Sequence, residues 1–300
     1  MRDSTDSTTS TVRIEAWGIS ILILLSCWGA AAVHQAAPQF RSGVNLVEVY
    51  AAVVNADGRP VSGLAREDFT VLEDGRQQSV TTFAEADFPL SVAIAIDRSF
   101  SMAKLLPIAK SGARTFLGEL RAGDQAMLVA IGSSIDTIAP LATSRDAQFD
   151  ALERLQPWGT TGLHDAIIES IDAIEAARGR RALVLLSDGQ DRYSHATADD
   201  AMEHARRSDV MIYPAALDGR RPRLFTDLAA LTGGRSFSPR TAAEVNTAMR
   251  AIAGELHHQY LLGYVPSRPI VPGRSEWRSI DVRVRRPGVT VRTRDGYVAR

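Results

Sequence analysis

Three oxygen-bearing side chains follow a run of six uncharged residues and have the chemistry to bind a metal ion. Asp97, Ser99 and Ser101 alternate along the chain directly after residues 91–96. A loop that curls at this point turns one carboxylate and two hydroxyls toward a common point. These hard oxygen ligands suit Mg²⁺, Mn²⁺ or Ca²⁺ rather than a soft metal. Asp-x-Ser-x-Ser is also common in turns and helix N-caps, so this segment alone leaves a purely structural role open.

Two later segments bring further oxygen ligands to the same edge of the expected sheet. Thr160 and Thr161 lie in Gly-Thr-Thr-Gly just before the helical pattern of residues 163–177, which places their hydroxyls at the mouth of a helix. A second buried-strand pattern, residues 181–187, ends in Asp188. In an open parallel sheet with helices on both faces, ligands bind at the carboxyl ends of the strands, where all three segments fall.

Together these segments resemble the von Willebrand factor A (VWA) domain family and its metal-ion-dependent adhesion site. Asp97, Ser99 and Ser101 match the family's Asp-x-Ser-x-Ser element, Thr161 matches its threonine loop, and Asp188 matches its apolar-strand-Asp-Gly segment. The resemblance implies that these side chains hold a divalent cation, directly or through water, with Mg²⁺ preferred over Mn²⁺ or Ca²⁺. It also implies that an acidic side chain of a partner takes the last coordination position.

Two positions depart from the family's pattern and bear on partner binding. Thr160 replaces a glycine of the threonine loop, which makes it an alternative ligand to Thr161 and a candidate partner contact. Phe100 stands where the family usually has glycine. Its ring is expected either to narrow access to the metal or to give a partner an apolar contact.

Strand and helix patterns alternate over residues 88–256, which predicts a doubly wound α/β domain with a mostly parallel, Rossmann-like sheet. Strands are expected at 91–96, 126–131, 181–187 and 210–216, with an edge strand at 135–140 and a short last strand at 235–237. Helices are expected at 103–120, 146–155, 163–177, 197–207, 224–231 and 242–256.

The flanking blocks, residues 41–87 and 257–300, carry β patterns but are each too small to fold alone. Strands are expected at 44–54, 69–72, 79–83, 260–265, 278–285 and 289–293, with 69–72 and 79–83 forming a hairpin-like pair. We expect the two blocks to pair into one small β-sandwich with the VWA domain inserted between its halves. This order, with a tail ending in Gly-Tyr, resembles VWA-related proteins of soil bacteria. The tail arginines, Arg278, Arg283, Arg285, Arg286, Arg292 and Arg294, are expected to guard a solvated strand edge.

Residues 1–40 predict a signal peptide or an N-terminal anchor. The apolar run 17–25 followed by small residues at 30–32 and 36–37 has the layout of a cleaved secretory signal. Acidic residues near the start weaken that match, and residues 17–33 also read as a short membrane anchor. Cys27, the only cysteine, lies here and offers lipid attachment as a further alternative. We therefore expect a secreted or periplasmic protein that meets a membrane only through this segment.

Composition and motifs argue against nucleic-acid binding and catalysis. The 300 residues carry 34 Lys and Arg against 35 Asp and Glu, a net charge of −1 without the basic excess of a nucleic-acid binder. The chain has no Gly-x-Ser-x-Gly, His-Glu-x-x-His or Gly-x-x-x-x-Gly-Lys-Ser/Thr motif. A hydrolase would need Ser99 or Ser101 to be activated by a distant base such as His164.

The sequence therefore predicts a non-enzymatic binding protein outside the cytoplasm. The resemblance implies that its VWA domain binds a divalent cation and, through it, an acidic group of a protein or peptide partner. Because two carboxylates share the ion with neutral hydroxyls, the bound ion keeps a net positive character, which attracts an anionic ligand. The alternative is a scaffold that assembles through its surface without metal, and a hydrolase is the least favoured reading.

Overall fold

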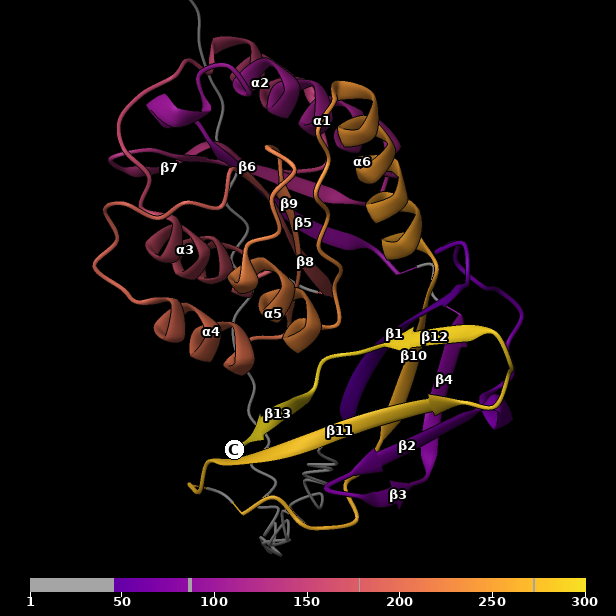
Figure 1. Ribbon diagram of the computed structural model, residues 1–300. Coiled ribbons are helices and arrows are strands. Elements are labelled where there is room, and N and C mark those ends of the chain that lie inside the picture. Colours follow the sequence, from indigo (N-terminus) through magenta and orange to yellow (C-terminus); the bar gives the residue numbers. More distant parts are fainter. Residues whose placement is uncertain (1–45, 86–87, 178, 272) are drawn as a thin grey trace, which may run out of the picture. The chain divides into compact units, whose positions relative to one another are not determined.

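The structure is a computed structural model that describes residues 46–300 apart from 86, 87, 178 and 272 (Figure 1). The predicted signal peptide or anchor, with Cys27, lies outside the described residues. Within the described part of the chain, no helix combines the length and the apolar character needed to cross a bilayer. The described residues form an α/β layer and two antiparallel sheets.

The α/β layer is built on a five-stranded sheet with the order β7-β6-β5-β8-β9. Its strands are β5 (Leu90–Asp97), β6 (Gln125–Ile131), β7 (Ile135–Ala142), β8 (Arg180–Ser187) and β9 (Val210–Ala216). All neighbours pair in parallel except β7, which is antiparallel to β6 at the edge. Every residue of β5 is buried, as expected for a central strand that is covered on both faces and carries its only acidic residue, Asp97, at its end. The predicted doubly wound α/β class is confirmed.

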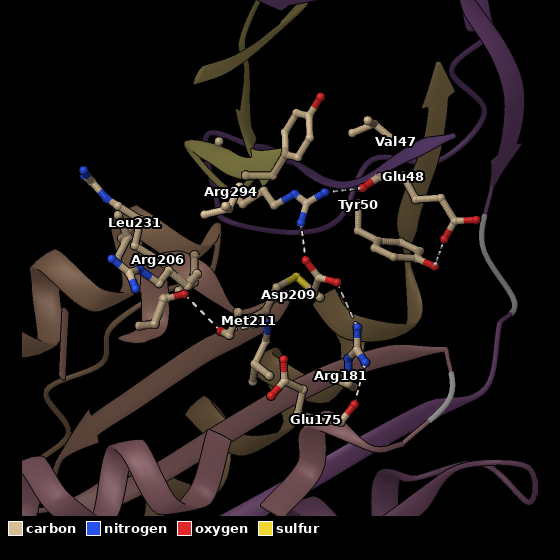
Figure 2. Close-up of a pocket in the computed structure, with 18 of the residues that line it drawn as sticks. Val47, Glu48, Tyr50, Glu175, Arg181, Arg206, Asp209, Met211, Leu231 and Arg294 are labelled. Atoms are coloured by element: carbon tan, nitrogen blue, oxygen red, sulfur yellow. Dashed lines mark hydrogen bonds and ion pairs between the residues drawn. The ribbon is translucent and has the colours of Figure 1, made fainter. Parts of the chain in front are cut away.

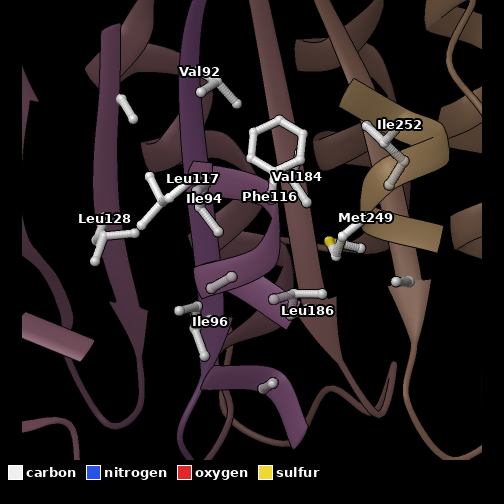
Figure 3. Packing of buried hydrophobic residues seen from close by; sticks show 14 of the residues in the cluster. Val92, Ile94, Ile96, Phe116, Leu117, Leu128, Val184, Leu186, Met249 and Ile252 are labelled. Carbon is white, nitrogen blue, oxygen red and sulfur yellow. The ribbon is translucent and has the colours of Figure 1, made fainter. Parts of the chain in front are cut away.

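Helices cover both faces of this sheet. One face carries α1 (Leu106–Glu119), α2 (Asp146–Arg154) and α6 (Ala242–His257), and the other carries α3 (Leu163–Glu175), α4 (Ala198–Arg207) and α5 (Arg223–Thr232). Side chains alternate along a strand, so neighbouring residues of β5 enter different cores. Val92, Ile94 and Ile96 pack among residues of α1 and α6 (Figure 3), whereas the small Ala93 and Ala95 belong to the core beneath α3.

The strand order places a topological switch point beside β5. The chain leaves β5 for β6 on one side, and β8 lies on its other side. Open sheets of this kind bind ligands past the carboxyl ends of the strands at such a point. Ile96 of β5 lies opposite Leu186 of β8, so the two strands end together and bring Asp97 and Asp188 to one edge.

The two antiparallel sheets combine strands from both ends of the chain. Their orders are β12-β1-β10-β4 and β13-β11-β2-β3. The strands are β1 (Val47–Asn55), β2 (Phe69–Glu73), β3 (Arg76–Gln78), β4 (Val80–Glu85), β10 (Gln259–Tyr264), β11 (Glu276–Val284), β12 (Val289–Arg292) and β13 (Gly296–Ala299). Strand β1 pairs with β10 and β2 pairs with β11, and the strands share one buried core. The prediction of one small β-sandwich built from N-terminal and C-terminal strands is confirmed.

Two local expectations were wrong, and one strand was not expected. Strand β2 pairs with β3 rather than with β4, because a two-residue Asp74-Gly75 turn with positive φ at both positions folds β2 directly onto residues 76–78. Strand β4 instead pairs with β10 in the other sheet. Residues 235–237 make only a single bridge, Phe237 to Ala215. The closing strand β13 was not expected.

Arg278 is not the exposed edge guard that the alternating pattern predicted. Strand β11 lies inside its sheet, and the Arg278 side chain is fully buried beside Glu73 of β2, with Nη1 3.2 Å from Oε1. The other oxygen of Glu73 accepts the hydroxyls of Tyr264 (2.8 Å) and Tyr297 (2.9 Å). A charge that is buried with a countercharge and fully hydrogen-bonded is tolerated where an isolated one is not.

Two more tail arginines differ from that expectation. Arg292 pairs with Glu255 of α6, and Arg294 pairs with Asp209 at the start of β9. Both therefore join the β-sandwich to the α/β layer. The remaining three, Arg283, Arg285 and Arg286, are exposed as predicted.

Candidate functional site

Asp97 ends β5 with a fully buried carboxylate that is oriented by neutral donors. Its Oδ1 accepts the Ser99 N–H (2.9 Å) and its Oδ2 accepts the Ser187 hydroxyl (2.7 Å). The Ser187 Oγ in turn accepts the Gly189 N–H (3.0 Å). These bonds fix the direction of the carboxylate and, because the donors are neutral, bring no positive charge to it.

Ser99 and Ser101 are brought together by a short 3₁₀ turn, Phe100–Met102. Their Oγ atoms lie 3.1 Å apart, with Ser99 buried and Ser101 exposed. The two hydroxyls are thus presented side by side directly after Asp97, which is the arrangement expected from their alternation in the sequence.

Asp188 lies just past the end of β8 and is almost fully buried. Its Oδ1 accepts the Gln190 N–H (3.0 Å) and its Oδ2 accepts the Gln190 side-chain amide (3.2 Å). Gly189 has φ of +78°, and a Cβ there would lie 2.3 Å from Cγ of Pro222, so this turn requires glycine. No ion pair to a described basic side chain neutralises Asp188 or Asp97.

Thr161 carries a buried hydroxyl without a hydrogen-bond partner among the described residues. Leaving such a group unsatisfied costs about 1–3 kcal/mol, and the ordinary reason is a bound ion or water. Its neighbour Thr160 is exposed, with its N–H bonded to Ser133 Oγ at 3.0 Å and its own Oγ 3.5 Å from the same atom. Thr161 therefore suits a buried ligand position better than Thr160.

Backbone hydrogen bonds tie the three loops to one another. The Phe100 N–H donates to the Gly159 carbonyl (3.0 Å), and the Arg192 N–H donates to the Thr161 carbonyl (3.0 Å). The loop that carries Thr161 is therefore bonded both to the loop after β5 and to the loop after β8. The structure brings all three predicted segments to the carboxyl edge of β5 and β8.

The electrostatics of this edge favour a cation. Burial raises the pKa of Asp97, and the charge of Asp188 raises it further, against hydrogen bonds from Ser99 and Ser187. A divalent cation relieves both the desolvation and the repulsion of the two carboxylates. In the described part of the chain, no group of three or more His, Cys, Asp or Glu side chains is placed to hold a metal. A metal at this edge therefore depends on the hydroxyl oxygens.

Two neighbouring acids, Asp165 and Asp191, hold the loop after β8 against the start of α3. Asp191 Oδ1 accepts the Leu163 N–H (2.7 Å) and the Ser194 hydroxyl (2.5 Å). Asp165 accepts the N–H groups of His195 and of the following residue, each at 2.8 Å. These carboxylates cap a helix and close a loop, which explains their positions without a ligand.

His164 takes part in the hydrogen bonds that close the loop after β8. Its Nδ1 lies 3.1 Å from the Ala196 carbonyl oxygen, and its backbone N–H donates to Ser194 Oγ (3.0 Å). The side chain thus belongs to the same loop-closing network, and no hydrogen bond joins it to Ser99 or Ser101.

A cavity of about 400 Å³ lies elsewhere, between the amino ends of β8 and β9 and the β-sandwich (Figure 2). Arg181 (3.0 Å) and Arg294 both bind Asp209 there, and Arg294 also donates to the Glu48 carbonyl (2.9 Å). These terminal guanidinium N–H groups already join one part of the protein to another. The cavity is separate from the edge that carries Asp97.

The sequence comparison identifies a family for part of this layer. Residues 92–190, which span all five predicted ligands, match the model of the von Willebrand factor type A domain family. A search of curated proteins found no match. The α/β layer is therefore a VWA-type fold.

Solved structures agree on the fold. A von Willebrand factor type A protein from Catenulispora acidiphila is 15% identical, with 84% of this chain and 73% of that chain covered and a TM-score of 0.51. A mutant of the PilB minor pilin from Streptococcus sanguinis is 12% identical, with 58% and 62% covered and a TM-score of 0.50.

Proposed function

We propose that this protein is an extracytoplasmic, non-enzymatic binding protein that grips its partner through a divalent cation. Asp97, Ser99, Ser101, Thr161 and Asp188 hold the cation, with Mg²⁺ preferred over Mn²⁺ or Ca²⁺. An acidic group of a protein or peptide partner completes the coordination. The observation that carries this proposal is the buried Thr161 hydroxyl, which lacks a partner beside a loop edge that holds two uncompensated carboxylates.

The roles of the five side chains follow from their burial. Asp97 and Asp188 are buried and supply the negative charge that attracts the cation. The two carboxylates match the formal charge of the cation and the hydroxyls add none, so a coordination position left open on the cation remains electrophilic and draws a carboxylate from the partner. Ser101 is the only exposed residue of the five, so we infer that the partner approaches from its side.

The extracytoplasmic location rests on the sequence of residues 1–40, with its apolar run and small-residue zone. A minor pilin among the similar structures is compatible with this location. N-terminal sequencing of the protein isolated from its host tests it, because export with cleavage yields a chain that starts near the small residues at 30–32 or 36–37.

Metal titration calorimetry on the purified protein tests the metal. Wild type is expected to bind Mg²⁺ with a Kd on the order of 10⁻⁴ to 10⁻³ M, the range of extracellular cation sites. Asp188→Ala should abolish this binding, because it removes one of the two charges. The matched control is Asp227→Ala, which removes a partly exposed carboxylate paired with Arg223 on α5 and should leave the affinity unchanged.

A pull-down from host extract, with and without chelator, separates the proposal from its rival. A metal-dependent adhesin loses its partner in chelator and in Asp188→Ala. If the partner is retained in both, the protein acts as a metal-independent scaffold.

A further inference from the structure

Exposed aromatic side chains lie on the loops of the candidate metal edge. The exposed large apolar residues in the described part of the chain are Leu46, Phe100, Trp158, Tyr193, Val265 and Val271. The three aromatic ones all lie on the loops that carry the candidate ligands. Phe100 (67% exposed) lies between Ser99 and Ser101, and Trp158 (43%) and Tyr193 (60%) lie on the loops of Thr161 and Asp188.

Contacts with neighbouring residues hold Trp158 and Tyr193 in place. The backbone N–H of Trp158 donates to the Arg98 carbonyl (2.7 Å). The Arg98 guanidinium lies 4.9 Å from the centroid of the Trp158 ring. The ring also packs against Gly132, where a Cβ would lie only 2.8 Å from it. Tyr193 meets the ring of His195 edge-on at 6.4 Å. Aromatic side chains on a rigid frame lose little conformational entropy on binding, and they are frequent energetic hot spots.

Arginines lie on the Asp188 side of the same edge. Arg192 is exposed in the loop after Asp188, and residues 217–223 carry the exposed Arg220, Arg221 and Arg223. This second loop is adjacent, because the Leu217 N–H donates to the Ser187 carbonyl (2.9 Å) and Pro222 fills the space beside Gly189.

Acidic residues of the described chain pair with only some of these exposed arginines. Arg220 pairs with Asp218 and Arg223 pairs with Asp227. Arg221 forms no ion pair with a described residue. Among the described residues, the Arg192 guanidinium bonds only to the neutral side chain of Gln190 (2.7 Å). The edge therefore offers guanidinium groups to an incoming anion.

We propose that the partner is a protein segment that combines several acidic residues with aromatic or other apolar residues. This inference rests on the proposed function, because one carboxylate of the segment completes the cation's coordination. Further carboxylates meet Arg192 and Arg221, and the apolar side chains pack on Phe100, Trp158 and Tyr193. We call these five residues the aromatic–arginine surface. A charge-complementary rim with an aromatic contact region gives such a segment both specificity and affinity.

Fluorescence anisotropy with labelled peptides tests this inference on the full chain. The probes are an acidic–aromatic peptide, an acidic peptide with alanine for each aromatic residue, and an aromatic peptide with asparagine or glutamine for each acid. In Mg²⁺ the first peptide should bind roughly tenfold or more tighter than either of the others, a difference of about 1.4 kcal/mol.

Surface variants with matched controls make the test specific. Tyr193→Ser and Arg221→Glu should each weaken binding of the acidic–aromatic peptide by roughly tenfold, the loss typical of truncating a contributing interface residue. The controls are Val265→Ser, which removes an exposed apolar side chain just after β10, and Arg250→Glu, which reverses an exposed charge in the middle of α6. Both controls should bind as wild type does.

The outcomes separate this inference from the proposed function. If chelator abolishes binding but Tyr193→Ser and Arg221→Glu bind like their controls, the metal site stands and the aromatic–arginine surface is refuted. If both variants weaken a binding that chelator does not change, the surface stands and the metal-dependent function is refuted. Equal affinity for the three peptides, or no binding to a protein that has bound Mg²⁺, overturns the inference.

Discussion

Replacing Thr161 by valine should make the metal-free protein more stable and the metal-bound protein no better. Valine keeps the shape of threonine but lacks the hydroxyl, which is buried without a partner. Its removal leaves no donor or acceptor unpaired and should relieve about 1–3 kcal/mol of burial cost. For a chain of this size, each kcal/mol corresponds to a Tm shift of about 2–4 °C.

Magnesium should stabilise wild type more than it stabilises Thr161→Val. A site with a Kd of about 10⁻⁴ to 10⁻³ M, in about 10 mM Mg²⁺, stabilises the folded state by about 1.4–2.7 kcal/mol. Wild type should show this gain. Thr161→Val should lose most of it, because one ligand of the cation is missing.

Thermal unfolding followed by circular dichroism, in chelator and in Mg²⁺, measures both effects. The matched control is Thr232→Val, since the Thr232 hydroxyl is also buried but donates to the Leu228 carbonyl (2.8 Å) and accepts the Ile212 N–H (3.0 Å). That variant should lose about 1–3 kcal/mol and keep its full response to Mg²⁺. The reasoning is refuted if Thr161→Val is destabilised in chelator as Thr232→Val is, or if it responds to Mg²⁺ as wild type does.

Two further predictions concern stability. Arg278→Met should destabilise the protein by about 3–5 kcal/mol in urea unfolding, because Glu73 is left as a buried charge without its partner; a loss below about 1 kcal/mol would contradict this account of the pair. Burial alone would raise the pKa of Asp124, but hydrogen bonds from His257 and from backbone N–H groups, including that of Leu90, hold this pKa below its usual value. Ionised Asp124 therefore stabilises the fold above the unfolded-state pKa of about 3.9, and this contribution is lost as the pH falls through the lower folded pKa. Asp124→Asn should be less stable than wild type near neutral pH, with a difference that shrinks below about pH 4; a difference independent of pH would rule this out.

The α/β layer was predictable from local patterns. Uncharged strands such as residues 91–96 indicate burial on both faces of a sheet. The helical patterns between these strands allow only a few ways of connecting them. The meeting of Asp97 and Asp188 at one edge follows from the same logic, because neighbouring parallel strands end on the same side of a sheet.

What the sequence could not supply were partners that are distant along the chain. Arg278 occupies a polar position in an alternating strand pattern, as an exposed residue would. Only the fold shows that Glu73, 205 positions earlier, lies beside it. The crossing of β4 to β10 is likewise a long-range pairing. At the candidate site, Trp158 and Tyr193 were missed, because an aromatic residue in a polar loop has no local signal that separates exposure from burial. A search for aromatic residues within a few positions of each expected ligand would have found both.

The pairing of β4 with β10 bears on how this architecture arose. Glu85, before the α/β layer begins, lies opposite Tyr260, just after α6 ends. An insertion whose two ends lie so close in the host costs little chain entropy and disturbs few host contacts. The β-sandwich can therefore accept different domains between β4 and β10. A short turn that joins these two strands directly would give the sandwich without an inserted domain.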